Sequence, residues 1–325
     1  MSRKPIIETR NLTKTFAQKV VAVNALTLSV PEGAVYGLVG RNGAGKSTTL
    51  RLLMGLLQPD QGEAMIFGQS MASAPSSLRE RVAYVSQSSR LPGWMALSDL
   101  FRCCEKQYSR WDSALAEQLL KSWGLKRSAR VNTLSGGEQR KAAIVLALAS
   151  RADVLLLDEP GAGLDPISRR ELLDALVDAL TRETTCTVLI STHLISDLER
   201  MAEYVGFMEH GNLAASVRLE DVLQQTRRVQ LVFEGSTAPA NLKIPGAFRV
   251  RATGPVVTAL VRLSLPGQSE VIEQTRGARV QWFPVNLEEL FIDWFGPDMN
   301  PGPTDFDEWK SLQDTDATTA TFSRR

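Results

Sequence analysis

The chain has little that would suit a secreted or membrane-spanning protein. Its three cysteines, Cys103, Cys104 and Cys186, are too few and too badly spaced for a disulfide or metal framework, which suits the cytosol. No apolar run approaches the length of about 18 residues that a membrane-spanning helix needs, and the charged first residues lack the apolar stretch of a secretory signal. A net charge of +1 gives no electrostatic reason to expect a nucleic-acid partner. With 325 residues, 43% of them hydrophobic, the chain can bury a large core.

A glycine-rich loop follows a short apolar stretch near the N-terminus. Residues 34–39 are typical of a buried strand, residues 40–47 match the pattern Gly-x-x-x-x-Gly-Lys-Ser, and 48–54 continue as a predicted helix. Bare glycine backbone can wrap phosphates, Lys46 can supply a positive charge to the terminal phosphates, and Ser47 can ligate Mg²⁺. A chance glycine-rich turn is the alternative. We expect nucleotide binding by Gly40, Arg41, Asn42, Gly43, Ala44, Gly45, Lys46, Ser47 and Thr48.

Two carboxylates follow a second apolar run. Residues 154–157 are apolar and lead into Asp158 and Glu159, which is typical of a central parallel strand that delivers acids at its carboxyl end. Asp158 is then the carboxylate on the Mg²⁺ side, and Glu159 is placed to polarise an attacking water. A surface strand that ends in two acids is the alternative.

The chain has two histidines, and they receive different interpretations. His193 follows a predicted strand at 187–190. By spacing alone, a solvated or core-satisfied histidine is favoured, but its position among the other motifs reverses that preference. His210 lies in a predicted hairpin turn and is assigned no chemistry.

The stretch Leu-Ser-Gly-Gly-Glu at 134–138 begins a predicted helix. Ser135 and Glu138 have the spacing of a capping box. Gly136 and Gly137 are unexpected in a first helical turn, because each costs up to about 1 kcal/mol relative to alanine. A helix N-terminus without side chains exposes N–H groups and the positive end of the helix dipole, which together favour a phosphate. The pattern therefore indicates a second phosphate contact.

Together these motifs resemble those of ABC transporter ATPase subunits over about residues 4–222. The resemblance makes 40–48 the Walker A loop, 134–138 the ABC signature and 154–159 the Walker B strand. It implies that four further residues contact the nucleotide site: Gln87 contacts Mg²⁺ and the attacking water, Asp165 belongs to the D-loop, His193 contacts the γ-phosphate, and Phe16 stacks on adenine.

The resemblance also implies a second copy of the chain. In ABC ATPases two copies face each other head to tail, and the signature of one caps the ATP held by the other. Ser135, Gly136 and Gly137 would then bind the partner's nucleotide. Gly161 stands where Thr or Ser is more usual, and Phe16 lacks the hydroxyl of the more usual Tyr. No catalytic position is degenerate, so we expect both sites of a homodimer to hydrolyse ATP.

The expected fold is α/β: a P-loop NTPase core of ABC type, with a mixed sheet, an antiparallel N-terminal layer and a helical subdomain, followed by a small α+β appendage. The expected domains are an ABC ATPase domain at 4–224 with its helical subdomain at about 89–150, a C-terminal α+β domain at 225–295, and a disordered acidic tail at 296–325. The appendage should hold strands near 228–233, 248–252 and 279–283, a helix at 269–276, and a last helix capped by Asn286. It resembles the C-terminal extension of ABC exporters.

The resemblance predicts an ATP-hydrolysing motor, with ATP and Mg²⁺ as cofactors, for a separate integral membrane permease. Export is favoured over import, and the subunit would be cytoplasmic, held at the inner face of the cell membrane through the permease. Two alternatives stay open: a soluble ABC ATPase that acts on ribosomes or DNA, and an importer subunit with a regulatory C-terminal domain. The first usually has two cores with a charged linker, or a coiled-coil insertion, and this chain shows neither.

Overall fold

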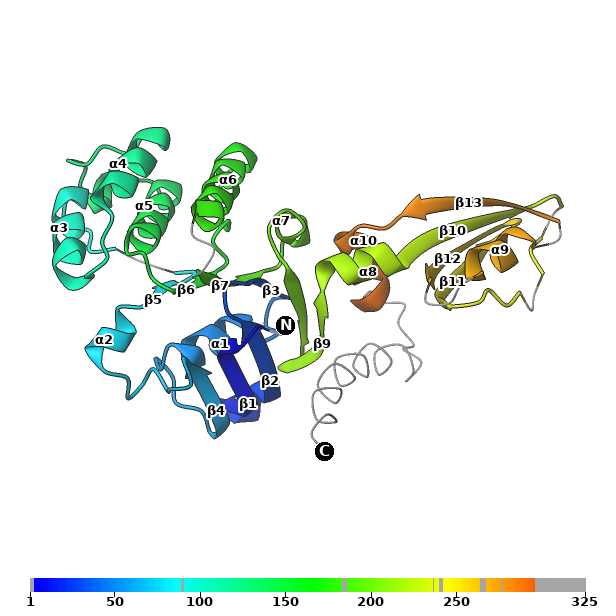
Figure 1. Cartoon of the computed structure of the whole chain (residues 1–325), viewed down its shortest axis with the longest axis horizontal. Helices are drawn as coiled ribbons and strands as arrows, with labels where there is room; N and C mark the ends of the chain where they lie inside the picture. Colours follow the sequence, from blue (N-terminus) through cyan, green and yellow to red (C-terminus); the bar gives the residue numbers. More distant parts are fainter. Residues whose placement is uncertain are drawn as a thin grey trace, which may run out of the picture. The chain divides into compact units, whose positions relative to one another are not determined.

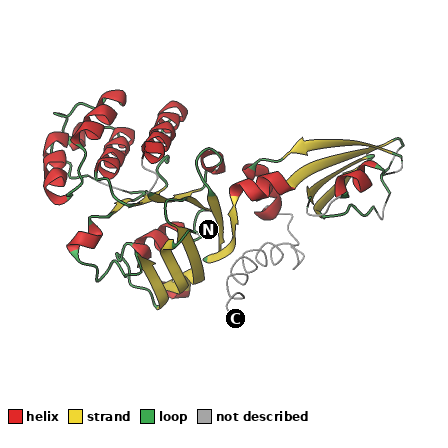
Figure 2. Ribbon diagram, viewed as in Figure 1, coloured by secondary structure: helices red, strands yellow, loops and turns green. Residues whose placement is uncertain are grey.

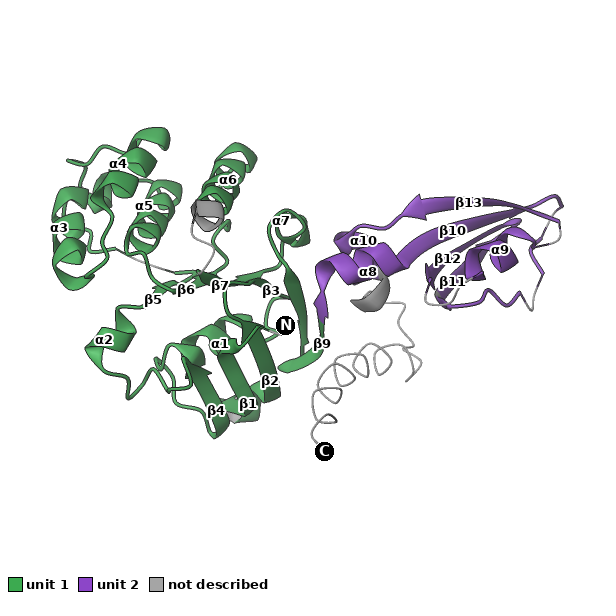
Figure 3. Ribbon diagram, viewed as in Figure 1, with its two compact units in different colours: residues 1–216 green, residues 217–325 purple. Residues whose placement is uncertain are grey.

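The computed structural model describes residues 3–88, 91–182, 186–235, 237–239, 242–263, 267–275 and 277–295. Its contacts divide the chain into two compact units, Met1–Ser216 and Val217–Arg325 (Figure 3). The division comes before the helix α8 (Leu219–Gln225), which contacts a strand of the second unit. The predicted tail at 296–325 lies outside the described residues.

The larger sheet of the first unit is six-stranded, with the order β5-β6-β7-β3-β8-β9 (Figures 1 and 2). Its strands are β3 (Val35–Gly40), β5 (Val82–Val85), β6 (Val154–Asp158), β7 (Thr187–Thr192), β8 (Tyr204–Glu209) and β9 (Asn212–Arg218). The pairs β5–β6, β6–β7, β7–β3 and β3–β8 are parallel. Because parallel strands end at a common edge, the sheet brings the ends of β3, β6 and β7 together.

A three-stranded antiparallel sheet accompanies the first, in the order β2-β1-β4. Its strands are β1 (Pro5–Phe16), β2 (Val20–Pro31) and β4 (Gln61–Ile66), and a short 3-10 turn, η1 (Ala17–Lys19), joins β1 to β2. The predicted antiparallel N-terminal layer is therefore confirmed, and it forms a sheet of its own.

Helices occupy the remaining parts of the first unit. In chain order they are α1 (Lys46–Leu53), α2 (Ser76–Arg79), α3 (Leu97–Gln107), α4 (Ser113–Ser122), the 3-10 turn η2 (Val131–Thr133), α5 (Gly136–Ala149), α6 (Pro166–Arg182) and α7 (Ile195–Leu198). Both α3 and α4 contact α5, and the three helices lie together in Figure 1 as the predicted helical subdomain. At the start of α4, the Asp112 carboxylate accepts a hydrogen bond of 2.8 Å from the Leu115 N–H and so caps the helix.

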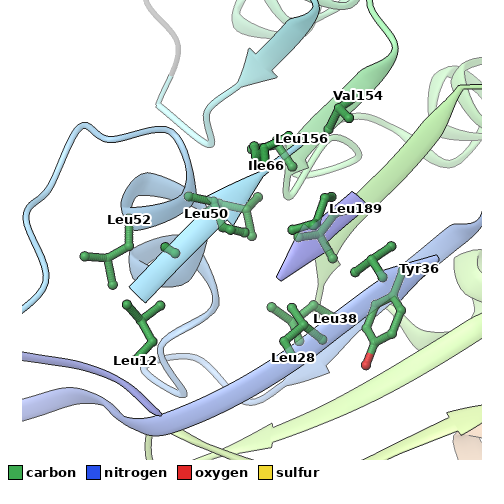
Figure 4. Packing of buried hydrophobic residues seen from close by; sticks show 14 of the residues in the cluster. Leu12, Leu28, Tyr36, Leu38, Leu50, Leu52, Ile66, Val154, Leu156 and Leu189 are labelled. Carbon is green, nitrogen blue, oxygen red and sulfur yellow. The ribbon is translucent and has the colours of Figure 1, made fainter. Parts of the chain in front are cut away.

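The main core of the first unit joins its two sheets through α1 (Figure 4). The side chains labelled there are at most 3% exposed: Leu12, Leu28, Tyr36, Leu38, Leu50, Leu52, Ile66, Val154, Leu156 and Leu189. Burying one such side chain stabilises the fold by about 1.5–3 kcal/mol relative to leaving it exposed. Since β3 and α1 both supply core residues, the loop between them has two fixed ends.

The second unit contains one four-stranded sheet, in the order β11-β12-β10-β13 (Figure 1). Its elements are α8, β10 (Thr226–Phe233), β11 (Ala247–Thr253), β12 (Val256–Arg262), α9 (Gln268–Glu273), β13 (Ala278–Pro284) and α10 (Leu287–Phe295). All its strand pairs are antiparallel, and one face of the sheet buries a small core with Ile272 of α9.

The sequence predicted most but not all of this second unit. The small α+β fold is confirmed, and so is the cap of α10, where the Asn286 Oδ1 accepts a 2.8 Å hydrogen bond from the Glu289 N–H. The predicted helix at 269–276 is shorter and ends at Glu273. The central strand β12 was missed, because its run of apolar residues lacks the alternation by which the other strands were found.

Candidate active site

The loop between β3 and α1 can be formed only with glycine at two positions. A Cβ on Gly45, whose φ is +103°, would lie 2.2 Å from the Ala22 carbonyl oxygen, and one on Gly40 would lie 2.3 Å from the Met208 carbonyl oxygen. Both neighbours are backbone atoms that cannot easily move. The loop therefore lies directly against two strands, and α1 begins at its end with free N–H groups.

Lys46 is held inside this loop. Its ammonium group donates to the Gly40 carbonyl at 2.7 Å and to the Arg41 carbonyl at 3.3 Å, and it lies 3.5 Å from the Glu159 carboxylate. Burial lowers the pKa of Lys46 below its usual value, while Glu159 and Asp158 oppose that shift. The loop thus contains a buried positive charge at the start of α1.

Asp158, at the end of β6, is fully buried, and its two carboxylate oxygens have different surroundings. Oδ1 accepts hydrogen bonds from the hydroxyls of Ser47 (2.8 Å) and Ser191 (2.5 Å). Oδ2 is buried and has no hydrogen-bond partner among the described residues. An orphaned buried oxygen of this kind needs an explanation, and a cation is one.

These donors fit Mg²⁺. Mg²⁺ prefers oxygen ligands and is usually bound through one or two carboxylates together with substrate phosphates and waters. The Asp158 carboxylate and the Ser47 hydroxyl provide such oxygens side by side. Within the described ranges no group of three or more His, Cys, Asp or Glu side chains could hold a metal.

Glu159 has a strained backbone and a close partner. Its φ of +49° lies in the left-handed region, which costs a residue other than glycine about 1–3 kcal/mol, and its N–H donates 2.9 Å to the Ser191 carbonyl of β7. The Glu159 Oε2 lies 2.7 Å from the Nδ1 of His193, which follows β7. Strain of this size persists where the surrounding structure fixes the residue, and Glu159 is only 4% exposed.

A hollow of about 470 Å³ lies over the loop and collects most of the predicted residues. Phe16 is 43% exposed at one side, and its ring can stack against a flat ligand. The lining consists of Phe16, Ala22, Asn42, Gly43, Ala44, Gly45, Lys46, Ser47, Thr48, Gln87 and Glu159. Asp158 and His193 do not line it, but each contacts a residue that does.

Four predicted residues lie elsewhere in the chain's own structure: Ser135, Gly136, Gly137 and Asp165 are absent from the lining of this hollow. Ser135 caps α5 in the predicted capping box, with its hydroxyl accepting from the Glu138 N–H at 3.2 Å. Asp165 accepts from the N–H groups of Ile167 and Ser168 at the start of α6, and these bonds with Ser168 lower its pKa. A Cβ on Gly136 would meet nothing within 4 Å, so its backbone is open to a ligand from outside the chain.

A basic residue beside the site was missed by the sequence. Arg140, on α5, donates to the Ser86 carbonyl at 2.7 Å and also to the Gln87 carbonyl. Burial lowers the pKa of Arg140, and Asp158 and Glu159 oppose that shift. The sequence offers one signal for Arg140: it is a cation five residues after Ser135, just before the apolar part of the same helix.

The fold and the site define a P-loop ATPase, and comparison with known proteins identifies its family. The ABC transporter family model matches residues 23–162. The chain is 33% identical over 301 residues to the Nod factor export ATP-binding protein I of Burkholderia lata, covering 90% of this chain and 98% of that protein. It is 27% identical over 293 residues to the ABC transporter ATP-binding protein YtrB of Bacillus subtilis. That match covers 90% of this chain and 98% of YtrB.

Solved structures agree. The structure of an ATP-binding subunit of an ABC transporter is 27% identical, with a TM-score of 0.60 over 68% of this chain and 92% of that one. A dimeric structure of MJ0796, a bacterial ABC transporter cassette, is 25% identical, with a TM-score of 0.57 over 66% and 98%. The chain therefore belongs to the ATP-binding proteins of ABC transporters; it binds ATP and is an ATP hydrolase. In the described part of the chain, no helix has the length and apolar character needed to cross a bilayer.

Proposed function

We propose that this chain is the ATP-hydrolysing subunit of an exporter and that it drives a separate integral membrane permease. The observation that carries the proposal is the hollow in which Lys46, Ser47, Gln87 and Glu159 meet beside the orphaned oxygen of Asp158. Relatives named for Nod factor export, daunorubicin/doxorubicin resistance and bacitracin transport support export as the direction.

In the proposed reaction, Glu159 accepts the proton of a water that attacks the γ-phosphate of ATP. His193, 2.7 Å from one oxygen of Glu159, orients this carboxylate, and Lys46, 3.5 Å from the other, supplies positive charge to the phosphates. Bound Mg²⁺ would neutralise phosphate charge, and Ser47, Gln87 and Asp158 are the residues that would hold it. The N–H groups of the loop and of the start of α1 complete the phosphate site.

Glu159→Gln tests the assignment of the base. We expect the variant to bind ATP with nearly unchanged affinity, because the amide keeps the shape of the side chain. Its turnover should fall by about 10²–10⁴, the usual contribution of a positioned base. Phosphate release and nucleotide titration measure the two quantities. Turnover close to that of the unaltered chain would show that another group takes the proton.

We also propose that two copies assemble head to tail, each covering the nucleotide of the other with Ser135, Gly136 and Gly137. The positions of these residues outside the chain's own hollow support this arrangement. Ser135→Arg should leave nucleotide binding by the single chain intact and abolish ATP-dependent dimerisation and hydrolysis. Ser128→Arg, at an exposed turn of the same subdomain, is the control. If Ser135→Arg instead removed nucleotide binding itself, Ser135 would belong to the chain's own site.

In this proposal the subunit is held at the inner face of the cell membrane through the permease, and it has no nucleic-acid partner. In this proposal residues 4–224 form the ATPase domain and 225–295 an accessory domain. Affinity purification from detergent-solubilised membranes tests the partner. Recovery of an integral membrane protein with this chain is expected. Recovery of ribosomes without one would favour the soluble alternative and refute the exporter.

A further inference from the structure

One face of the sheet in the second unit is rich in arginine. Residues that pair across antiparallel strands present their side chains on the same face. The register therefore assigns a single face, here called the arginine face, to Arg228, Arg249, Arg251, Arg262 and Arg279. The other strand positions of this face are Thr226, Gln230, Val232, Thr253, Val256, Thr258, Leu260, Gln281 and Phe283, and none of them is acidic.

The arginine face is distinct from the core of the unit. The opposite face holds the buried apolar residues and α9. On the arginine face there is a hollow of about 230 Å³, lined by Arg228, Arg249, Arg251, Thr258, Ala259 and Leu260. These lining residues include no carboxylate. Several guanidinium groups at one hollow produce a positive potential that attracts an anion.

A carboxylate from outside the sheet already reaches this face. Glu289, on α10, lies 2.9 Å from the Arg228 guanidinium. The chain continues from the end of α10 into residues 296–325. That segment therefore follows, in the chain, an element that contacts the arginine face.

The sequence of this segment matches the face in chemistry. Residues 305–316 contain five carboxylates, Asp305, Asp307, Glu308, Asp314 and Asp316, against the single cation Lys310. Phe306 and Trp309 stand among these acids. Guanidinium groups pair with carboxylates and also stack on aromatic rings. Phe283, which is 39% exposed on the same face, offers a further apolar contact.

The chain is also long enough. Phe295 is six helical steps after Glu289, so the helix ends about 9 Å beyond the contact with Arg228. Ten extended residues then reach up to about 33 Å from Phe295 to Asp305. The strands of seven residues are about 23 Å long. Every position of the arginine face is within reach.

We propose that the acidic segment at 305–316 binds the arginine face of its own chain. Its carboxylates pair with Arg249 and Arg251, and its aromatic rings lie against guanidinium planes and Phe283. A short tether gives such a segment an effective concentration of about 1 mM or more, so that weak individual pairs suffice.

A labelled peptide of residues 303–318 tests the proposal, with fluorescence anisotropy as the readout. It is titrated into the full chain and into a chain that ends at Phe295. We expect the shortened chain to bind the peptide and the full chain to bind it at least about tenfold more weakly, because the tethered segment competes. Binding should weaken at high salt and with a peptide whose acids are replaced by amides.

Two arginine variants of the shortened chain identify the surface. Arg249→Gln with Arg251→Gln should lower the affinity by at least about tenfold, whereas Arg10→Gln with Arg102→Gln, on the first unit, should leave it unchanged. Thermal unfolding of both variants checks that they are folded. The proposal would be overturned if the peptide bound the full and shortened chains equally or bound neither. It would also be overturned if binding of the peptide survived the Arg249 and Arg251 changes. Self-association of the full chain that truncation abolishes would show binding between copies and would also overturn it.

Discussion

Replacing Arg140 by alanine should slow ATP hydrolysis without weakening nucleotide binding. The Arg140 guanidinium joins α5, the helix capped by Ser135, to the backbone of Ser86 and Gln87. It does not line the hollow that would hold ATP. Its loss therefore frees Gln87 from its position while the phosphate loop stays as it is.

The size of the effect follows from these contacts. A hydrogen bond from a charged donor is worth about 1.5–3 kcal/mol, and Arg140 is only half-buried, so we take that range for the two bonds together. If this free energy holds Gln87 in place for the reaction, its loss slows turnover by about 10-fold to 150-fold. Arg140→Lys keeps the charge but has a single ammonium group in place of the planar fork, so it should recover only part of the rate.

Steady-state phosphate release gives kcat, and titration with a fluorescent ATP analogue gives the affinity. Arg130→Ala, at an exposed arginine of the same subdomain, is the matched control. A kcat of Arg140→Ala within about twofold of this control would refute a positioning role for Arg140. A kcat that falls only in step with the melting temperature, with neither recovered by Arg140→Lys, would show that Arg140 is merely structural.

Three further predictions concern stability. Gly45→Ala should destabilise the chain by about 1–3 kcal/mol in urea unfolding and abolish nucleotide binding, because its Cβ meets the Ala22 carbonyl. The control is Gly68→Ala, at a glycine that also has a positive φ, of +71°, but has open space around it. Equal losses of stability in the two variants would refute the clash. Asp112→Asn keeps the α4 cap but loses the ion pair with Arg151. The free energy of unfolding at pH 7 should therefore fall by about 0.5–1 kcal/mol. The Leu115 N–H and Arg151 lower the pKa of Asp112 below 3.8, so the stabilisation is complete above that pH and is lost as the pH falls through the lowered pKa; a difference that persisted at acid pH would contradict this origin. Gly161→Thr should lower the melting temperature by about 2–4 °C, because its Cβ would lie 3.3 Å from the Arg169 side chain that pairs with Asp197, and an unchanged melting temperature would show that Arg169 moves aside freely.

Local chemistry explains which features the sequence revealed. The phosphate loop, the Asn286 cap and the Ser135 capping box each depend on a few neighbouring residues, so each can be recognised from the sequence alone. The strands β6 and β7 were found because continuous apolar runs are typical of buried parallel strands. Their polar ends then indicated a common edge.

Contacts between distant segments were harder to predict. Arg140 contacts residues more than fifty positions earlier, and nothing in the sequence near it identifies that partner. The strand β12 lies at the centre of its sheet and lacks regular alternation.

The two carboxylate oxygens of Asp158 differ in their hydrogen bonding. Oδ1 is saturated by the hydroxyls of Ser47 and Ser191, which fix the carboxylate to α1 and β7, while Oδ2 keeps its lone pairs. An asparagine of the same shape would have to turn its oxygen toward the serines to keep those bonds. Its NH₂ group would then face the position proposed for the cation and would repel it. At this residue, the substitution that changes size least replaces an oxygen acceptor by an N–H donor.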